Sequence, residues 1–370
     1  MKISVLTSSR ADYGIYLPLL KKIKEDNSFE LEIIAFGTHL SKSHGYTLTE
    51  IENQGFDCIH TISSLIANDD EQAIATSYGL TVLKFADFWQ VNKYDLVFCL
   101  GDRFEMSAAV QAGIPFNVKF AHLHGGETTL GAIDNIYRNQ ITLASKLHFT
   151  AVELFSERVI ELIGQNKNVY TVGSLSLNEI EKFQPINKTE FFEKFKLPNK
   201  DFALITFHPE TVNTEMNRHF AREMRIALSQ VASKLILVIT MPNADTMGSV
   251  FRMEIEQLKN EFSTQVICVE NFGKENYFSA MYYAKLLIGN TSSGIIEAAS
   301  FGKYVVNVGD RQQGRMQSDN VINTPFNYQN IIEVVDKAII NKAFIGKNKY
   351  YNKHAADLII HHIKQFNEIL

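Results

Sequence analysis

Short apolar, β-branched runs recur along the chain, and the longer segments between them carry apolar residues three or four positions apart. This alternation is typical of βαβ units, which build parallel sheets. In Ile15–Lys24, the residues Ile15, Leu19 and Ile23 lie on one stripe, which predicts a helix packed on a sheet. We therefore expect an α/β protein. The strand-like runs are Ile3–Leu6, Leu31–Phe36, Asp95–Leu100, Val118–Leu123, Leu147–Thr150, Val169–Val172, Phe202–Phe207, Leu235–Thr240, Val266–Val269, Leu286–Gly289 and Tyr304–Val308.

The runs fall into two series, separated by a polar, proline-containing stretch around Phe183–Thr189. We place a domain boundary near residue 180. Each series predicts a Rossmann-like, doubly wound domain, the first over residues 1–180 and the second over residues 181–351. Residues 352–370 have an amphipathic helical pattern, and we expect this helix to pack back on the first domain. A chain of 370 residues with 45% hydrophobic residues is long enough for two such cores.

Composition excludes several classes of partner. The 36 basic and 41 acidic residues are interspersed and give a net charge of -5, so no basic field can bind nucleic acid or an anionic membrane. Cys58, Cys99 and Cys268 stand singly in apolar runs, which predicts buried, reduced thiols rather than a disulfide or zinc framework. The N-terminal apolar run is too short for a signal peptide, and no stretch reaches the roughly 18 apolar residues of a membrane span. We expect a cytoplasmic protein.

Three carboxylates follow strand-like runs of the first series: Asp102, Glu127 and Asp134. The carboxyl ends of parallel strands meet at one edge of a sheet, so these residues should gather there. Clustered carboxylates divide into proton donors and proton acceptors, as acid–base chemistry requires. Arg103 is the expected partner of Asp102. The structural alternatives are a turn residue for Asp102 and a helix N-cap for Asp134.

Several polar features at strand ends suit a nucleoside diphosphate. The run Thr291–Ser293 precedes a helical segment whose first backbone N–H groups could bind phosphate, and Glu297 could accept two ribose hydroxyls. An ordinary helix N-cap explains the same run equally well. Arg311 and Arg10 also follow strands, and Asn243 could contact the base or ribose. The sequence has no G-x-G-x-x-G motif after the first strand and no Walker A motif, which disfavours a dinucleotide-binding enzyme or an ATPase.

Histidines form a second group of candidates. His208 follows the first strand of the second series, just before a proline, and could donate a proton; a buried structural histidine is the alternative. His122 and His124 alternate on a strand and, with Glu127, resemble part of a metal site. No fourth candidate ligand stands out, so we expect no metal. The pair His361–His362 is expected at the surface.

Taken together, the motifs resemble a known enzyme family. In chain order they are Ser9–Gly14, Gly101–Arg103, His124–Glu127, Ile133–Asp134, Phe207–Glu210, Pro242–Asp245, Gly289–Gly294 and Gly309–Arg315. This set resembles the hydrolysing UDP-N-acetylglucosamine 2-epimerases. The resemblance implies two Rossmann-like domains in the GT-B arrangement with an active-site cleft between them. It also implies no metal or nicotinamide cofactor, a UDP-sugar substrate, and a homodimer or homotetramer.

The resemblance implies a reaction as well. UDP is eliminated across C1 and C2 of the sugar to give a 2-acetamidoglycal, which is hydrated to release N-acetylmannosamine for nonulosonic (sialic-type) acid biosynthesis. Proton transfer and leaving-group assistance would fall to Asp102, Glu127, Asp134 and His208. The UDP-sugar would be held by Arg10, Arg103, His124, Asn243, Thr291, Ser292, Ser293, Glu297 and Arg311. Many relatives carry a glutamate at the position of His124, so its role passes here to Glu127 or to the imidazole.

Three alternatives stay open. The same chemistry could act on UDP-2,4-diacetamido-2,4,6-trideoxyglucose of the legionaminic acid pathway, to which the sequence Glu127–Asn135 is closer. A GT-B glycosyltransferase would share the fold and the UDP site, but it would need an apolar or basic acceptor patch that the first domain lacks. A non-catalytic nucleotide-sugar sensor would keep the motifs of the second domain and lose the carboxylates of the first, yet all three are present.

Overall fold

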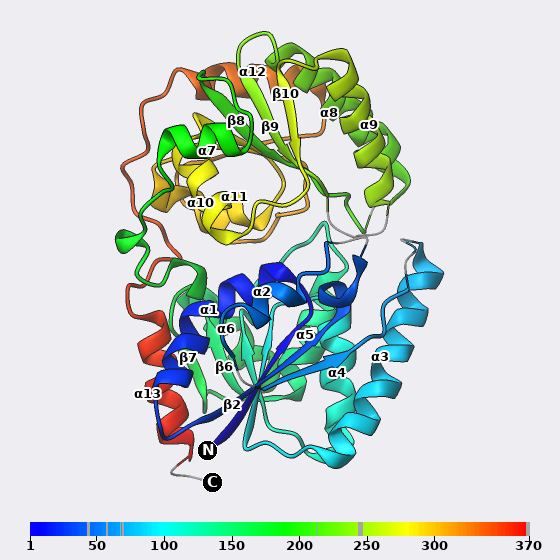
Figure 1. Cartoon of the computed structure of the whole chain (residues 1–370), viewed down its shortest axis with the longest axis vertical. Coiled ribbons are helices and arrows are strands. Elements are labelled where there is room, and N and C mark those ends of the chain that lie inside the picture. Colours follow the sequence, from blue (N-terminus) through cyan, green and yellow to red (C-terminus); the bar gives the residue numbers. More distant parts are fainter. Residues whose placement is uncertain are drawn as a thin grey trace. The chain divides into compact units, whose positions relative to one another are not determined.

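A computed structural model describes residues 1–42, 45–56, 58–66, 68, 70–212, 214–242 and 247–367. The chain divides into two compact units, each with its own sheet (Figure 1). Unit 1 comprises Met1–Glu127, Asp134–Ile180 and Tyr350–Leu370, and unit 2 comprises Thr128–Ile133 and Glu181–Lys349. The segment Thr128–Ile133 thus groups with unit 2, although the sequence analysis included it in the first domain.

Unit 1 contains a seven-stranded parallel sheet in the order β3-β2-β1-β4-β5-β6-β7. Its strands are β1 (Lys2–Thr7), β2 (Glu30–Phe36), β3 (Ile59–Ile62), β4 (Leu96–Leu100), β5 (Phe120–Leu123), β6 (Ser145–Thr150) and β7 (Val169–Thr171). Its helices are α1 (Arg10–Glu25), α2 (Leu48–Glu52), α3 (Glu71–Val91), α4 (Phe104–Gly113), α5 (Asp134–Ala144), α6 (Glu153–Ile163) and α13 (Ala355–Asn367).

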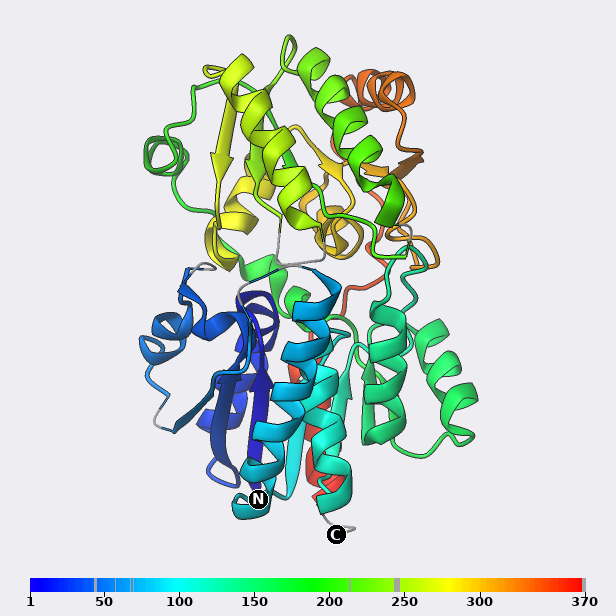
Figure 2. The same cartoon turned by 90° about the vertical axis from the view of Figure 1, so that its right-hand side faces the viewer.

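Both faces of this sheet are covered, because successive side chains of a strand point to opposite sides. On β2, Ile33 and Ala35 pack with α1 and α13, whereas Ile34 and Phe36 pack with α3 and α4. Figure 2 shows these layers from the side of α3, the light-blue helix. The short apolar runs of the sequence are therefore strands that are buried on both faces.

Unit 2 contains a six-stranded parallel sheet in the order β10-β9-β8-β11-β12-β13. Its strands are β8 (Phe202–Thr206), β9 (Ile236–Thr240), β10 (Val266–Val269), β11 (Leu286–Gly289), β12 (Val305–Val308) and β13 (Val321–Thr324). Its helices are α7 (Lys188–Lys194), α8 (Asn217–Val231), α9 (Gly248–Glu261), α10 (Lys274–Tyr283), α11 (Ser292–Ile296) and α12 (Tyr328–Ile339). Helices α8, α9 and α12 cover one face, and α7 and α10 cover the other.

Each sheet reverses its strand order at one place, between β1 and β4 in unit 1 and between β8 and β11 in unit 2. Open α/β folds bind ligands at the carboxyl ends of the strands beside such a reversal. The residues that follow these four strands are Ser8–Arg10, Gly101–Arg103, Phe207–Glu210 and Asn290–Ser293. These motifs of the sequence analysis therefore stand where the topology of each unit favours a ligand.

The C-terminal helix α13 is part of the core of unit 1. Its buried residues Ala355, Ile359 and Ile363 pack into the cluster that also contains Leu19 and Ile23 of α1. In Figure 1 the red α13 lies beside the blue α1, although nearly the whole chain separates them in sequence. Helix α13 therefore covers the same face of the sheet as α1.

Every strand expected from the sequence is present, with ends shifted by at most two residues, but two strands were missed. Both missed strands, β3 and β13, are four-residue edge strands with exposed polar positions and little apolar periodicity. Helix α1 begins at Arg10, earlier than expected, because Ser9 and Asp12 form a capping box. No helix in the described ranges is long and apolar enough to cross a membrane.

Two smaller predictions need correction. Of the three thiols, only Cys99 is buried, whereas Cys58 and Cys268 are half-buried. His361 is exposed as expected, but His362 is half-buried and stacks on Tyr170 with a ring-centroid distance of 3.6 Å. His362 deviates because α13 packs on β7, which is distant in sequence, whereas the two half-buried thiols lie at the edges of the sheets, beside β3 and on β10.

The packing of α13 predicts a stability effect. Ile359→Ala should lower the free energy of unfolding of unit 1 by about 2–5 kcal/mol, because Ile359 is fully buried and its truncation leaves a cavity. Ile345→Ala is the matched control: Ile345 is 97% exposed, and its truncation should change the value by less than about 0.5 kcal/mol. Urea unfolding of both variants measures this, and equal effects would show that α13 does not stabilise the unit.

Candidate active site

The side chain of Arg138 is the centre of the candidate site in unit 1. It lies on α5 and is 2% exposed. Its Nη1 donates a hydrogen bond to the backbone carbonyl of His124 at 2.8 Å and lies 3.8 Å from Glu127 Oε2, while its Nη2 pairs with Asp102 Oδ2. One buried guanidinium thus brings together two of the expected acidic residues, as its planar fork of donors allows.

The sequence analysis missed Arg138 and paired Asp102 with Arg103 instead. In the structure, Arg103 donates to the buried carboxylate of Glu105 through Nε and Nη2, both at 3.2 Å. A signal for Arg138 was present, because it stands four residues after Asp134, and residues four apart on a helix share a face. Asp134 is the first residue of that helix, α5.

His124 and Glu127 form a buried pair at the end of β5. The strand ends at Leu123, so the expected alternation stops before His124, which has a left-handed backbone conformation with φ of 65°. His124 Nδ1 lies 2.6 Å from Glu127 Oε1, and the two side chains are 9% and 1% exposed. Gly126 permits this turn, because a Cβ atom there would lie 2.2 Å from the carbonyl oxygen of Phe155.

His122 does not join this pair in a metal site. Its Nδ1 lies 3.0 Å from Thr142 Oγ1, and its Nε2 lies 2.9 Å from the Gly101 carbonyl oxygen. Burial lowers the pKa of His122 to about 3, although the bond to Gly101 opposes this shift. Both ring nitrogens of a neutral imidazole are therefore used inside the protein. His122 thereby orients the turn that precedes Asp102. It is not available as a ligand for the metal site considered in the sequence analysis.

The N-terminus of α1 already holds a carboxylate. Asp12 Oδ2 accepts hydrogen bonds from the backbone N–H groups of Ser8 at 2.7 Å and Ser9 at 3.1 Å. Arg10, the first residue of this helix, pairs with Glu50 at 3.0 Å. A phosphate at this helix would compete with Asp12 for the N–H groups and with Glu50 for the guanidinium, which weakens the expectation placed on Arg10.

In unit 2, Asn290 holds the backbone of His208 from both sides. Asn290 Oδ1 accepts the His208 N–H at 2.7 Å, and Asn290 Nδ2 donates to the His208 carbonyl at 2.8 Å. The Asn290 carbonyl accepts hydrogen bonds from Gln312 Nε2 at 2.8 Å and from Arg311 Nη1 at 3.5 Å. This fully buried residue joins the loops after β8, β11 and β12. In the sequence analysis, Asn290 was only a member of the motif Gly289–Gly294.

Glu210 fixes the same loops with its carboxyl group. Its Oε1 accepts the N–H of Asp310 at 2.8 Å, and Asn217 bonds to the Glu210 N–H and carbonyl at 3.0 and 2.7 Å. Burial raises the pKa of Glu210, although the bond from Asp310 opposes the shift. This carboxyl therefore positions the loop that carries Arg311.

The expected phosphate cradle is a short helical turn. Helix α11 has five residues, and Thr291 is its N-cap residue, although its side chain makes no capping hydrogen bond. Ser293 Oγ lies 2.7 Å from the hydroxyl of Tyr277, whose pKa burial raises to about 12. Glu297 follows the helix and is buried. Asn243 lies outside the described residues.

The segment Thr128–Ile133 is bonded to two loops of unit 2. The Leu130 N–H donates to the Gln313 carbonyl at 2.9 Å, and the Gly131 carbonyl accepts the Thr211 N–H at 3.2 Å. These loops follow β12 and β8, the strands that also lead to Arg311 and His208. The segment is thereby part of the candidate site in unit 2.

The backbone of Gly131 lies against the backbone of Arg311. A Cβ atom on Gly131 would lie 2.7 Å from the backbone nitrogen and Cα of Arg311, so the approach requires glycine. Glu127 and Asp134, both in unit 1, flank the segment in the chain. The segment between these two acidic residues in the chain therefore contacts Arg311 within unit 2.

A family model described as UDP-N-acetylglucosamine 2-epimerase matches residues 21–364. The chain belongs to this family. A relative from Campylobacter jejuni, named GDP/UDP-N,N'-diacetylbacillosamine 2-epimerase (hydrolyzing), is 34% identical over 329 residues, which cover 88% of this chain and 85% of the relative. The polysialic acid biosynthesis protein P7 of Escherichia coli is 31% identical over 369 residues, which cover 99% of this chain and 94% of that protein.

A solved structure extends the comparison to the fold. The UDP-GlcNAc 2-epimerase of Neisseria meningitidis, crystallised with UDP-GlcNAc, matches 99% of this chain and 100% of its own with a TM-score of 0.82 at 17% identity. The resemblance and the fold class of two Rossmann-like, doubly wound sheets are confirmed. This epimerase-family chain is an enzyme of the hydrolysing 2-epimerase type, which removes the sensor and glycosyltransferase alternatives.

Three buried histidines of unit 1 predict a loss of stability in acid. Burial lowers the pKa of His39 to about 4, of His122 to about 3 and of His148 to about 4, from an ordinary value of 6.5. Between about pH 6.5 and about pH 4 the unfolded chain therefore binds protons that the folded unit does not. Stability is present above this window and falls as the pH is lowered through it.

His148→Leu tests the sign of this effect. His148 is 1% exposed and its Nδ1 has no hydrogen-bond partner among the residues that the structure describes, so the leucine should be tolerated and should remove one protonation step. The loss of unfolding free energy between about pH 7 and about pH 5 should shrink by about 2 kcal/mol. His219→Leu, at an exposed position of unit 2, should leave the pH dependence unchanged. An unchanged slope in His148→Leu would contradict the prediction.

Proposed function

We propose that this epimerase acts on a UDP-2-acetamido sugar, with UDP-N-acetylglucosamine as the main candidate. It eliminates UDP across C1 and C2 to give a 2-acetamidoglycal and then adds water to release N-acetylmannosamine. The observation that carries the proposal is the buried Arg138, which holds Asp102 beside the pair of His124 and Glu127. Removing the proton from C2, returning one to C2 and taking one from the water that adds at C1 requires acidic and basic groups held this close together.

Exposure separates the roles within this group. Asp102 is 23% exposed and can touch a substrate, so we assign it the removal of the C2 proton. Glu127 is 1% exposed and bonds to His124 Nδ1, which leaves Nε2 on the opposite side of the imidazole ring. Glu127 then orients His124, and the imidazole transfers a proton in the hydration step. Asp134, at the start of α5, remains a second predicted acid–base residue.

The departing diphosphate needs cations and hydrogen-bond donors. His208, held by Asn290, and Arg311, on the loop fixed by Glu210, are the proposed residues for this task. The proposed phosphate and ribose contacts are Thr291, Ser292, Ser293, Glu297 and Asn243. Arg10 and Arg103, which we also proposed as ligands, must first leave Glu50 and Glu105.

The substituents at C4 and C6 of the sugar define a second candidate. The name of the Campylobacter jejuni relative supports the same reaction on UDP-2,4-diacetamido-2,4,6-trideoxyglucose, and the name of the Escherichia coli relative supports a role in sialic acid synthesis. Either product is a C2-inverted 2-acetamido sugar of the kind used to make nonulosonic acids. A homodimer or homotetramer remains a prediction.

A proton NMR time course in D2O tests the proposal. The enzyme is offered UDP-N-acetylglucosamine and, separately, its 2,4-diacetamido-6-deoxy analogue, and the faster reaction identifies the substrate. We expect release of UDP together with a free manno-configured sugar that carries deuterium at C2. Asp102→Asn should slow this reaction by at least about 100-fold, because the base is lost. Asp87→Asn, at an exposed position of the same unit, should leave it unchanged. Two intact nucleotide sugars after long incubation would refute the proposal.

A double-mutant cycle tests the coupling of His124 and Glu127. If Glu127 acts through the imidazole, His124→Gln and Glu127→Gln should each lower kcat on the order of 100-fold, and the double variant should be no slower than either one. His354 and Asp357 form the matched control, an exposed histidine–carboxylate pair with the same spacing of three residues. His354→Gln should leave kcat unchanged. Additive losses in the cycle would assign the two residues separate roles.

A further inference from the structure

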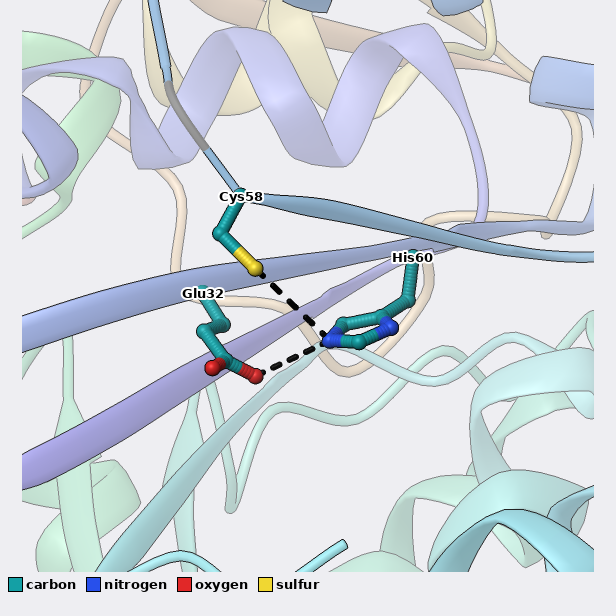
Figure 3. Close-up of side chains that lie close together, drawn as sticks. All are labelled: Glu32, Cys58 and His60. Atoms are coloured by element: carbon teal, nitrogen blue, oxygen red, sulfur yellow. Dashed lines mark hydrogen bonds and ion pairs between the residues drawn. The ribbon is translucent and has the colours of Figure 1, made fainter.

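Three metal-ligating side chains meet at the amino end of the sheet of unit 1. Glu32 is on β2, His60 is on β3, and Cys58 directly precedes β3 (Figure 3). Their ligand atoms all lie within 4.8 Å of one another. His60 Nε2 lies 2.9 Å from Glu32 Oε2 and 3.8 Å from Cys58 Sγ. The candidate catalytic residues follow the carboxyl ends of the strands, so this group belongs to a different part of the unit.

The spacing of these atoms fits a zinc ion. Zn–S and Zn–N bonds of about 2.3 and 2.0 Å at tetrahedral angles place neighbouring ligand atoms about 3.3–3.6 Å apart. The observed 2.9 and 3.8 Å bracket this range, and the third pair, Glu32 and Cys58, lies within 4.8 Å, so side-chain adjustments can bring the three atoms to these distances. A thiol, an imidazole and a carboxylate are also the ligand types that zinc prefers. In Figure 3 the thiol of Cys58 and the carboxylate of Glu32 both point toward the same ring nitrogen of His60.

Neighbouring residues already orient the carboxylate. Lys2 Nζ lies 2.8 Å from Glu32 Oε1, and the Tyr94 hydroxyl donates to Oε2 at 2.6 Å. Outer hydrogen bonds of this kind fix the orientation of metal ligands. With Cys58 ionised, the charges of Glu32, Cys58 and Lys2 sum to one negative charge, which suits a divalent cation.

The site is also accessible. The His60 side chain is 33% exposed, and Cys58 is half-buried, so an ion and a coordinating water can enter from solvent. A competing role as a reactive thiol is disfavoured, because burial and the charge of Glu32 raise the pKa of Cys58.

We propose that Glu32 Oε2, Cys58 Sγ and His60 Nε2 bind one zinc ion, with water as the fourth ligand, and that this ion fastens the edge strand β3 to the sheet. Binding releases the thiol proton to solvent and leaves the imidazole protonated on Nδ1. In the described sheet, β3 is an edge strand that pairs with β2. The ion therefore adds a second link between these two strands. The site is independent of the proposed 2-epimerase reaction.

Cobalt substitution tests the proposal on the full-length enzyme. The protein is stripped of metal under reducing conditions and titrated with Co2+, and zinc is then added in competition. We expect one equivalent of Co2+ per chain, a thiolate-to-cobalt charge-transfer band, and loss of this band as zinc displaces cobalt. Stoichiometric zinc should also raise the melting temperature, because it binds the folded state preferentially.

Variants locate the site. Cys58→Ser should abolish the charge-transfer band and weaken zinc binding on the order of 100-fold. Cys268→Ser removes the other half-buried thiol and should leave both unchanged. His60→Gln and Glu32→Gln should weaken zinc binding while the thiol is intact, which covers the case in which Cys58→Ser misfolds. Absence of the band in the wild type, or its survival in folded Cys58→Ser, would overturn the proposal.

Discussion

A guanidinium that is almost fully removed from water must be surrounded by anions and carbonyl oxygens, and Arg138 imposes this constraint on unit 1. An unpaired charge at such depth would cost several kcal/mol, so Asp102, Glu127 and the His124 carbonyl have to lie where they can compensate it. The contacts of Arg138 depend on several features of the fold. Strands β4 and β5 are neighbours, α5 begins at Asp134, and the chain turns sharply at Gly126. The same contacts that stabilise Arg138 keep the acid–base groups together.

In unit 2, an uncharged residue joins the loops of the candidate site. Asn290 offers a donor and an acceptor to the backbone of His208, and its own carbonyl receives the side chains of the loop after β12. An amide can do this without a counter-ion, because it offers a donor and an acceptor and carries no charge. The difference agrees with the proposed division of roles, in which unit 1 supplies the acid–base groups and unit 2 supplies cations and donors for a diphosphate.

The parts that were predictable from the sequence are those encoded by local pattern. Strands buried on both faces are continuous apolar runs, so all of them except the short edge strands β3 and β13 could be found. The acidic candidates could be found because they follow those runs. Asn290 and the partner of Arg103 could not, because their contacts depend on which strands are neighbours and on which side chains meet there. Arg138 had a local signal in its spacing from Asp134, but its contacts with Asp102 and Glu127 depend on the same neighbours. The group of Glu32, Cys58 and His60 was hidden for the same reason, since His60 lies on a missed strand.

The glycines of the loop between β5 and α5 are explained by its path rather than by a general need for flexibility. Gly126 has a positive φ and lies against the backbone of Phe155 in unit 1, while Gly131 lies against the backbone of Arg311 in unit 2. A side chain at either position would push the loop off one of its two anchors. Glu127 follows the first glycine directly, and Asp134 comes three residues after the second. Within unit 1, Glu127 is therefore held next to a fixed point of the backbone, which is the geometric condition for placing a proposed acid–base group reproducibly.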